Sequence, residues 1–146
     1  MPYIKADRRK VFNKYLIPLL NESHYDVIWS LILAYADKRG HCYTTYNAIL
    51  GVLTAVIYEL RRRPEIAIAT NRHNSDTIIH PKIEQLSKLI DTPGELNYCI
   101  MQIIRHTDLD AAEEMMELII NKFYHNVVAP YEDHKIKENG DLEELL

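Results

Sequence analysis

Two pairs of carboxylates near the end of the chain have a spacing that could bind a metal ion. Glu114 and Glu117 are three residues apart, and Glu138 and Asp141 repeat that spacing further along. On facing helices, carboxylates at positions i and i+3 can hold Mg²⁺ against a triphosphate. The second pair, however, straddles Asn139-Gly140, which is typical of a turn. The alternative is a solvated acidic face, and we assign no catalytic residue, metal ligand or cofactor from this pattern.

A run of three arginines offers a different chemistry, the binding of an anion. Arg61, Arg62 and Arg63 follow a long apolar stripe and directly precede Pro64. Guanidinium groups at the end of a helix complement its dipole, and their planar forks also suit phosphate or carboxylate groups. We therefore include Arg61 and Arg62 in a predicted binding site.

The segment after Pro130 mixes aromatic, acidic, basic and amide side chains. Because proline disfavours helical geometry at the residue before it, we expect the preceding helix to break there. Loop residues of such mixed chemistry on a rigid scaffold commonly carry function. We predict that residues 131–133 fold back beside Arg61 and Arg62, where they close a ligand pocket or only clamp the tail to the surface. The predicted ligand- or partner-binding residues are Arg61, Arg62, Tyr131, Glu132, Asp133, Lys135, Asn139 and Asp141.

Length and composition describe one globular domain that spans residues 1–146. Apolar residues make up 47% and charged residues 26% of the chain, as in ordinary globular proteins. No apolar run approaches the ~20 residues of a membrane span, and the N-terminus lacks the apolar core of a signal peptide. Cys42 and Cys99 match no metal or redox spacing, so we expect reduced thiols and a cytoplasmic protein without membrane contact.

Charge is distributed unevenly along the chain. Residues 1–80 contain 11 Lys/Arg and 7 Asp/Glu, a net charge of +4, whereas residues 81–146 contain 6 and 14, a net charge of −8. The acidic total of −4 argues against non-specific nucleic-acid binding. Ten tyrosines against two phenylalanines suit wet interfaces. Since the oppositely charged halves of two chains can attract one another, we predict a homodimer.

Apolar periodicity predicts an all-α fold of about six helices. The first three helices are expected from Asp7 to about Leu20, from the cap Ser23 to a stop at Gly40, and from a cap at Thr44 or Thr45 to Arg63. After the mixed residues 64–80, three more are expected over residues 82–90, 92–104 and 107–127. In the second of these, Thr92, Pro93 and Glu95 have the types preferred at a helix start.

The two halves of the chain match one another. With an offset of 69, Ser23 and Asp26 fall on Thr92 and Glu95. With an offset of 63, the apolar stripe from Ala48 to Leu60 falls on the stripe from Ala111 to Phe123, and residues 74–76 fall near residues 139–141. We interpret this as an internal duplication, with one repeat over about residues 7–76 and the other over about residues 82–141. The repeats should form two similar three-helix halves related by a pseudo-two-fold axis.

Three segments carry a resemblance to a known group of proteins. These are Met1-Pro-Tyr-Ile-Lys with Arg9, Gly94-Glu-Leu-Asn-Tyr98, and the run from Val128 to Asp141 with the pattern Ala-Pro-Tyr-Glu-Asp-x-Lys-Ile-x-Glu-Asn-Gly-Asp. The chain resembles an uncharacterised family of small bacteriophage and bacterial proteins. That family usually has two arginines before Val-Val-Ala-Pro, where this chain has His125 and Asn126. The resemblance implies an origin and no mechanism.

Three functions are compatible with the sequence. The leading hypothesis is a small non-enzymatic binding protein, encoded by a phage and acting in the host cytoplasm, that engages a protein partner or captures a small anionic, nucleotide-like ligand. The alternative is a metal-dependent all-α nucleotide pyrophosphohydrolase that uses Glu114, Glu117, Glu138 and Asp141. A purely structural homo-oligomer needs only the charge asymmetry.

Overall fold

The computed structural model describes residues 2–68 and 81–145, and it confirms the all-α class. No described residue lies in a β-strand. A short 3₁₀ turn follows α3, and α6 and α7 are joined by a π-helical segment, so that the seven α-helices of the described residues form six rods. The helices are α1 (Ala6–Leu19), α2 (His24–Arg39), α3 (Tyr43–Arg62), α4 (Pro81–Leu89), α5 (Pro93–Ile104), α6 (Leu109–Phe123) and α7 (Ala129–Asn139), with the 3₁₀ turn at Pro64–Ile66 and the π-helical segment at Tyr124–Val128.

Most helix ends follow the local chemistry that predicts them. The Ser23 and Thr92 hydroxyl groups accept the backbone N–H of Asp26 and Glu95, at 3.3 Å and 3.1 Å. Gly40 ends α2 with a φ of 98°, a conformation that glycine adopts without strain. The predicted cap of the third helix is wrong, because Cys42, in extended geometry, precedes a helix that already begins at Tyr43.

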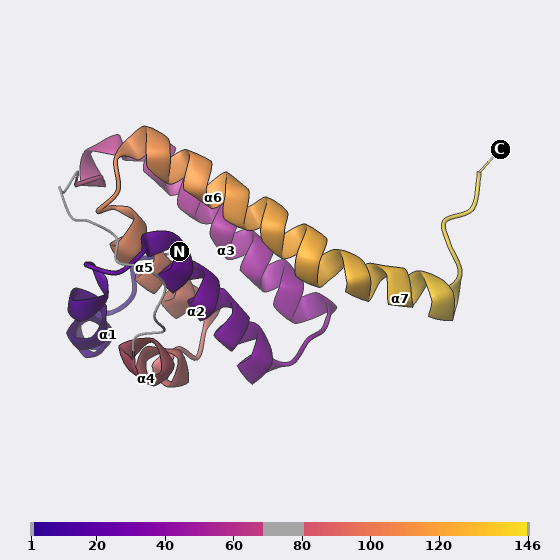
Figure 1. Cartoon of the computed structure of the whole chain (residues 1–146), viewed down its shortest axis with the longest axis horizontal. Coiled ribbons are helices and arrows are strands. Elements are labelled where there is room, and N and C mark those ends of the chain that lie inside the picture. The colour runs from indigo at the N-terminus through magenta and orange to yellow at the C-terminus, as the bar shows by residue number, and fades with distance from the viewer. Residues whose placement is uncertain (1, 69–80, 146) are drawn as a thin grey trace.

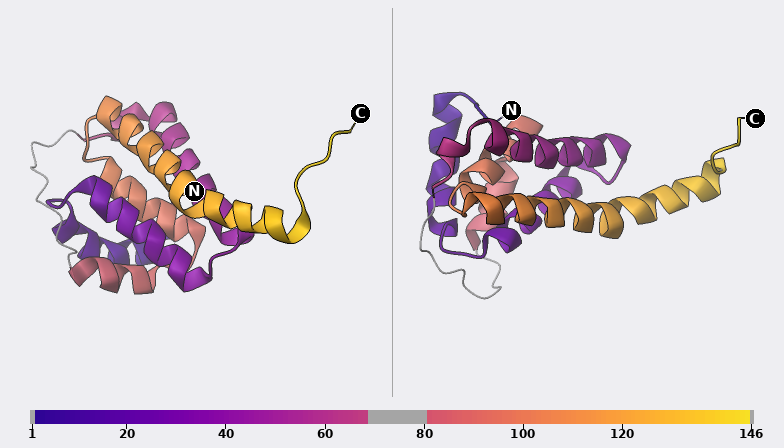
Figure 2. Two further views of the ribbon diagram at one scale, coloured as in Figure 1. Left: turned by 45° about the vertical axis from the view of Figure 1, so that its right-hand side comes forward. Right: turned by 90° about the horizontal axis from the view of Figure 1, so that it is seen from above.

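The core lies around α5, which packs against α1, α2 and α3. Every residue of α5 from Glu95 to Met101 is buried. On one side of it α3 and α6 lie side by side, and on the other side α1 packs against α4 (Figures 1 and 2). The apolar stripes of residues 48–60 and 111–123 therefore form much of the contact between α3 and α6 and the rest of the core. The fully inaccessible side chains of these two stripes are Ile49, Leu53, Val56, Leu60, Ala112, Met116, Ile119 and Phe123.

The helical rod of α6 does not break at Pro130, contrary to the sequence expectation. Residues 124–128 form a π-helical segment in which the N–H of Ala129 donates to the carbonyl of Tyr124, five residues back. Proline lacks an N–H group, and its ring collides with the carbonyl four residues earlier in an α-helix. We attribute the tolerance of Pro130 to this wider segment, which changes the pairing pattern just before the ring.

As a result, α7 continues the rod and projects from the body of the molecule (Figures 1 and 2). None of its residues is buried. The rod ends at Asn139, and Gly140 follows with a φ of 87°, in agreement with the turn predicted at Asn139-Gly140. No helix within the described residues is both long and apolar enough to cross a membrane.

The internal duplication stays a prediction. The helices of the two halves follow in the same order, and equivalent positions of α3 and α6, such as Val56 and Ile119, are equally inaccessible. The proposed exit turn of the first repeat, residues 74–76, lies outside the described residues.

Candidate functional site

Arg61 and Arg62 are engaged in ion pairs on the outside of the α3–α6 pair. The Nε atom of Arg61 lies 3.1 Å from Glu113, and its Nη2 atom lies 3.8 Å from Glu117. Arg62 donates to the Glu59 carboxylate one turn back on α3. The hydrogen bond from this guanidinium lowers the pKa of Glu59. Neither arginine is among the residues that line the pocket described below.

The remaining predicted residues lie on or just after α7, at the opposite end of α3. The ring of Tyr131 contacts the ring of Tyr46, with centroids 5.3 Å apart. Tyr46 and Arg61 are 15 residues apart on one helix, about 22 Å at 1.5 Å per residue. The predicted fold-back is therefore wrong, because the π-helical segment carries Tyr131 outward along the rod. Lys135 pairs with Glu138 at 3.1 Å. The other residues of this group are Glu132, Asp133, Asn139 and Asp141.

The two carboxylate pairs do not face one another. Glu114 and Glu117 are on α6, Glu138 is on α7, and Asp141 follows α7, so that all four lie along one rod and its extension. Glu117 and Glu138 are about 30 Å apart at 1.5 Å per residue. Within the described residues, no group of three or more His, Cys, Asp or Glu side chains is placed to hold a metal ion.

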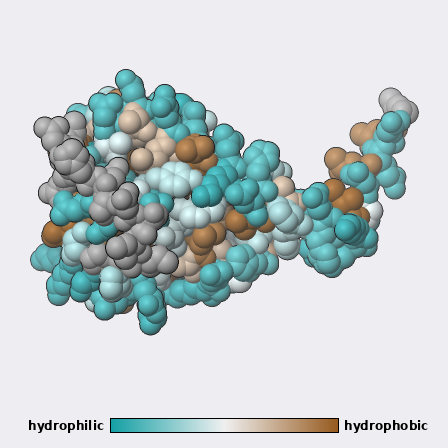
Figure 3. All heavy atoms as spheres, viewed as in Figure 1, coloured by the Kyte–Doolittle hydropathy of each residue, from teal (hydrophilic) through white to brown (hydrophobic). Residues whose placement is uncertain are grey.

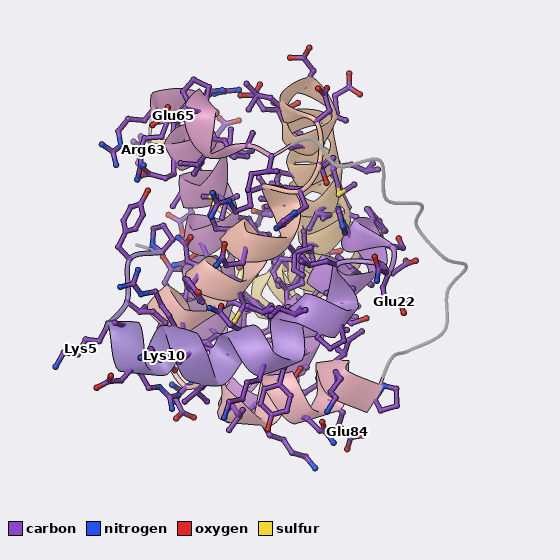
Figure 4. The ribbon with its side chains drawn as sticks, turned by 90° about the vertical axis from the view of Figure 1, so that its left-hand side faces the viewer. Lys5, Lys10, Glu22, Arg63, Glu65 and Glu84 are labelled. Atoms are coloured by element: carbon purple, nitrogen blue, oxygen red, sulfur yellow. The ribbon has the colours of Figure 1, made fainter. Side chains whose placement is uncertain are left out.

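A basic pocket instead lies where α1, α5 and the end of α3 meet, and it encloses about 430 Å³. Four of its lining residues are cationic, and none of those described is acidic. Figure 4 views this side of the molecule, with Lys10 on α1 and Arg63 above it. We call this site the basic pocket. Its lining residues are Pro2, Tyr3, Ala6, Arg9, Lys10, Asn13, Arg63, Ile66, Tyr98, Met101, Gln102 and Arg105.

A chain of hydrogen bonds fixes the wall of the basic pocket formed by α5. Arg105 donates through Nε to the carbonyl of Ile66 at 2.9 Å and through Nη1 to Gln102 Oε1 at 3.2 Å. The amide of Gln102 donates to the Tyr98 hydroxyl at 2.9 Å, and that hydroxyl donates to Asn13 Oδ1 at 2.6 Å. Because each side chain holds the next, the wall is preorganised before any ligand arrives.

Arg63 and the N-terminal segment form the opposite rim. The Nη1 atom of Arg63 donates to the Tyr3 hydroxyl at 2.8 Å, and its Nε atom donates to Glu65 at 3.1 Å. The Tyr3 hydroxyl in turn donates to Glu59 at 3.0 Å. Arg9 and Lys10 are exposed on the first turns of α1, whose N-terminal end adds a partial positive charge.

Sequence reasoning missed this pocket, because its cations come from three separate segments. Arg9 and Lys10 belong to α1, Arg63 follows α3, and Arg105 follows α5. One signal was available. Tyr3, Arg9 and Tyr98 belong to the segments that carry the family resemblance, and the structure brings these residues together in one pocket.

Comparison with known proteins gives one match. A family model described as "Domain of unknown function (DUF6899)" matches residues 68–142, which is 75 of the 146 residues. No curated protein and no solved structure matches the chain. The matched range includes α4 to α7 and the α5 wall of the basic pocket.

Proposed function

We propose that this chain, which belongs to the DUF6899 family, is a non-enzymatic binding protein that captures a small anionic ligand in the basic pocket. One observation carries the proposal: four cationic side chains and no described carboxylate line a single recess. Glu65 offsets the charge of Arg63, but Arg9, Lys10 and Arg105 have no ion-pair partner among the described residues, and like charges held together are unfavourable unless an anion offsets them. The predicted anionic ligand is thus retained, and its site moves from Arg61 and Arg62 to the pocket beside them.

The lining supports an organic phosphate such as a nucleotide. Guanidinium groups bind phosphate oxygens in pairs, and three of the four cations are arginines. Ile66 adds apolar surface, and the exposed ring of Tyr3 adds aromatic surface that suits a base or another planar group. The enclosed volume lies in the range of about 300–1,000 Å³ that is typical of small-molecule sites.

Calorimetric titration with adenosine triphosphate and with inorganic pyrophosphate tests the proposal. Because Lys10 is exposed, Lys10→Glu should leave folding intact and weaken binding at least tenfold, as expected when a charge-assisted contact worth about 1.5–3 kcal/mol is replaced by repulsion. Lys14→Glu is the matched control, because Lys14 is exposed on the same helix and does not line the pocket. Equal affinities of the two variants for both probes would overturn the assignment.

A protein partner is the second candidate, and the observation that favours it is α7. A helix without a single buried residue is costly to maintain unless something covers it. The nucleotide pyrophosphohydrolase has less support, since its carboxylate pairs lie along one rod. In a purely structural homo-oligomer, α7 would likewise be the contact surface, covered by a second copy of the chain.

Origin and location also belong to the proposal. The resemblance to small bacteriophage and bacterial proteins supports a phage-encoded protein that acts in the host cytoplasm. Both cysteines are free, Cys42 exposed and Cys99 buried, as expected in a reducing compartment. Burial raises the pKa of the Cys99 thiol, which keeps it protonated and inert.

A further inference from the structure

The projecting end of the chain, residues 129–145, combines acidic and apolar side chains, and we call it the arm. It contains six acidic and two basic residues, a net charge of −4, whereas residues 1–128 contain 15 of each and are neutral. Leu142 and Leu145 are 97% and 95% exposed. Figure 3 shows the arm as a largely hydrophilic projection with hydrophobic residues gathered at its far end. A complementary surface must therefore be basic and must offer an apolar recess.

The basic pocket has both properties, and the apolar groove between α2 and α4 has only one. The groove encloses about 740 Å³ and is lined by Leu33, Ala34 and Ile83. Its two lysines are already engaged: Lys38 donates to Asp91 at 2.9 Å, and Lys88 lies 3.4 Å from Glu84. In the basic pocket Arg63 pairs with Glu65, but Arg9, Lys10 and Arg105 have no ion-pair partner among the described residues and lie beside the apolar side chains of Ile66 and Met101.

The arm cannot reach the basic pocket of its own chain. Its root packs on Tyr46, and the pocket includes Arg63 directly after α3, so that the 17-residue separation along the helix corresponds to about 25 Å. The 11 residues of α7 extend a further 16 Å or so away from the body, in the direction seen in Figure 1. Residues 140–145 span at most about 22 Å when fully extended. The pocket and the arm can meet only between two molecules.

We propose that the arm of one copy occupies the basic pocket of a second copy. Asp141, Glu143 and Glu144 approach the cationic rim, and one of the exposed leucines enters the recess beside Met101. An antiparallel pair places each arm at the other copy's pocket, so that two equivalent contacts close within one dimer. The inference rests on the proposed function in one respect, that the pocket takes anions, and it makes the arm a competitor of the small ligand.

A charge exchange on the full chain tests the contact by light scattering. The first variant, Asp141→Lys/Glu143→Lys/Glu144→Lys, has a basic arm and a basic pocket. The second, Arg9→Glu/Lys10→Glu, has an acidic arm and two carboxylates on the α1 side of the pocket, whose lining becomes net neutral. The wild type should have the mass of a dimer at low salt, and each variant alone should be a monomer. An equal mixture of the two should recover the dimer mass, because the acidic arm then meets an unchanged basic pocket and the basic arm meets the two new carboxylates.

Charge-matched variants outside the contact serve as controls. Glu84→Lys/Asp110→Lys/Glu114→Lys changes three exposed acidic residues outside the arm, and Lys14→Glu/Lys88→Glu changes two lysines that do not line the pocket. Both should remain dimeric. A monomeric wild type, a dimer that survives either pocket or arm reversal, or a mixture of the two reversed variants that stays monomeric would overturn the inference.

Pyrophosphate separates this inference from the proposed function. If both hold, pyrophosphate binds the basic-arm variant in calorimetry and converts the wild-type dimer to monomers. Recovery of the dimer in the mixture without pyrophosphate binding would support the arm contact and refute the small-ligand function. Pyrophosphate binding without recovery of the dimer in the mixture would support the small-ligand function and refute the arm contact.

Discussion

At the scale of single residues, Asn97 is a polar side chain buried in an apolar core. It is 1% exposed on α5, and neither atom of its side-chain amide has a hydrogen-bond partner in the described part of the chain. Burying an amide without a partner costs about 1–3 kcal/mol. The neighbouring Tyr98 and Gln102, by contrast, are fully engaged in the wall of the basic pocket.

Replacing Asn97 by leucine, which has the same branching but is larger, should raise the free energy of unfolding by about 1 kcal/mol, because two unpaired polar groups leave the core. Denaturant unfolding of the wild type and Asn97→Leu measures the change. Asn97→Ala is the control for size, since it leaves a cavity and should destabilise. A clear loss of stability in Asn97→Leu would indicate that the amide has a partner, such as an ordered water.

Lys38 and Asp91 give a residue-scale prediction about pH. The Nζ atom of Lys38 donates to Asp91, to the carbonyl of Lys88 in the last turn of α4 and to the carbonyl of Ile90 just after it, at 2.8–2.9 Å. The hydrogen bond from Lys38 lowers the pKa of Asp91 below its ordinary value of 3.8. The pair therefore stabilises the folded state above that value, and the stabilisation is lost as the pH falls through the lower pKa of the folded state.

Thermal unfolding of the wild type and Asp91→Asn should show a difference at about pH 6 that shrinks toward pH 3. Asp91 is largely exposed, so the difference is expected to be small. In a Lys38→Met background, Asp91→Asn should have no such pH dependence. A difference that grows on acidification would contradict the assigned sign.

Single residues were also where sequence reasoning fell short. The arginine run was correctly singled out, but the partners of Arg61 depend on the antiparallel contact of α3 with α6, which no local pattern specifies. Only Arg63 of that run lines the basic pocket. Arg105 reaches the pocket because its guanidinium is held by a carbonyl of the 3₁₀ turn, 39 residues earlier in the chain.

At the scale of elements, local chemistry predicted the helices and most of their ends. Ser23 and Thr92 each accept a backbone N–H three residues on, and the two stripes of α3 and α6 are the faces that are buried. Pro130 was the exception. The rule that proline ends a helix holds for regular α-helices, and just before Pro130 the backbone hydrogen bonds change from four-residue to five-residue spacing.

The stripes of α3 and α6 lead to a prediction about packing. Val56→Asp or Ile119→Asp should prevent folding, since an unpaired buried charge costs several kcal/mol against a total stability of about 5–15 kcal/mol. Tyr58→Asp and Leu118→Asp are the matched controls, because these side chains on the same helices are 63% and 57% exposed. Circular dichroism during heating measures the outcome. Cooperative unfolding of the first two variants would show that these positions are not core.

At the scale of the whole molecule, the body is electrically neutral and the arm carries the entire net charge. Sequence analysis detected a charge asymmetry but divided the chain at residue 80, whereas the structural division lies near residue 128. The difference arises because acidic residues of α6 pair with Arg61 of α3 within the body. The predicted homodimer thereby gains a specific contact, and the charge exchange described above decides it.

The π-helical segment determines how α7 is rotated about the common axis of α6 and α7, and so which way the side chains of the arm point. A regular α-helix turns by about 100° per residue, so one residue more or fewer before Pro130 would rotate every side chain of α7 by roughly that angle. The ring contact between Tyr131 and Tyr46 would then be lost, and the acidic side chains of α7 would point in a different direction around the rod. An insertion or deletion within residues 124–128 would therefore rotate α7 about the rod axis. It would change the direction in which the arm's side chains point without changing the sequence of the arm.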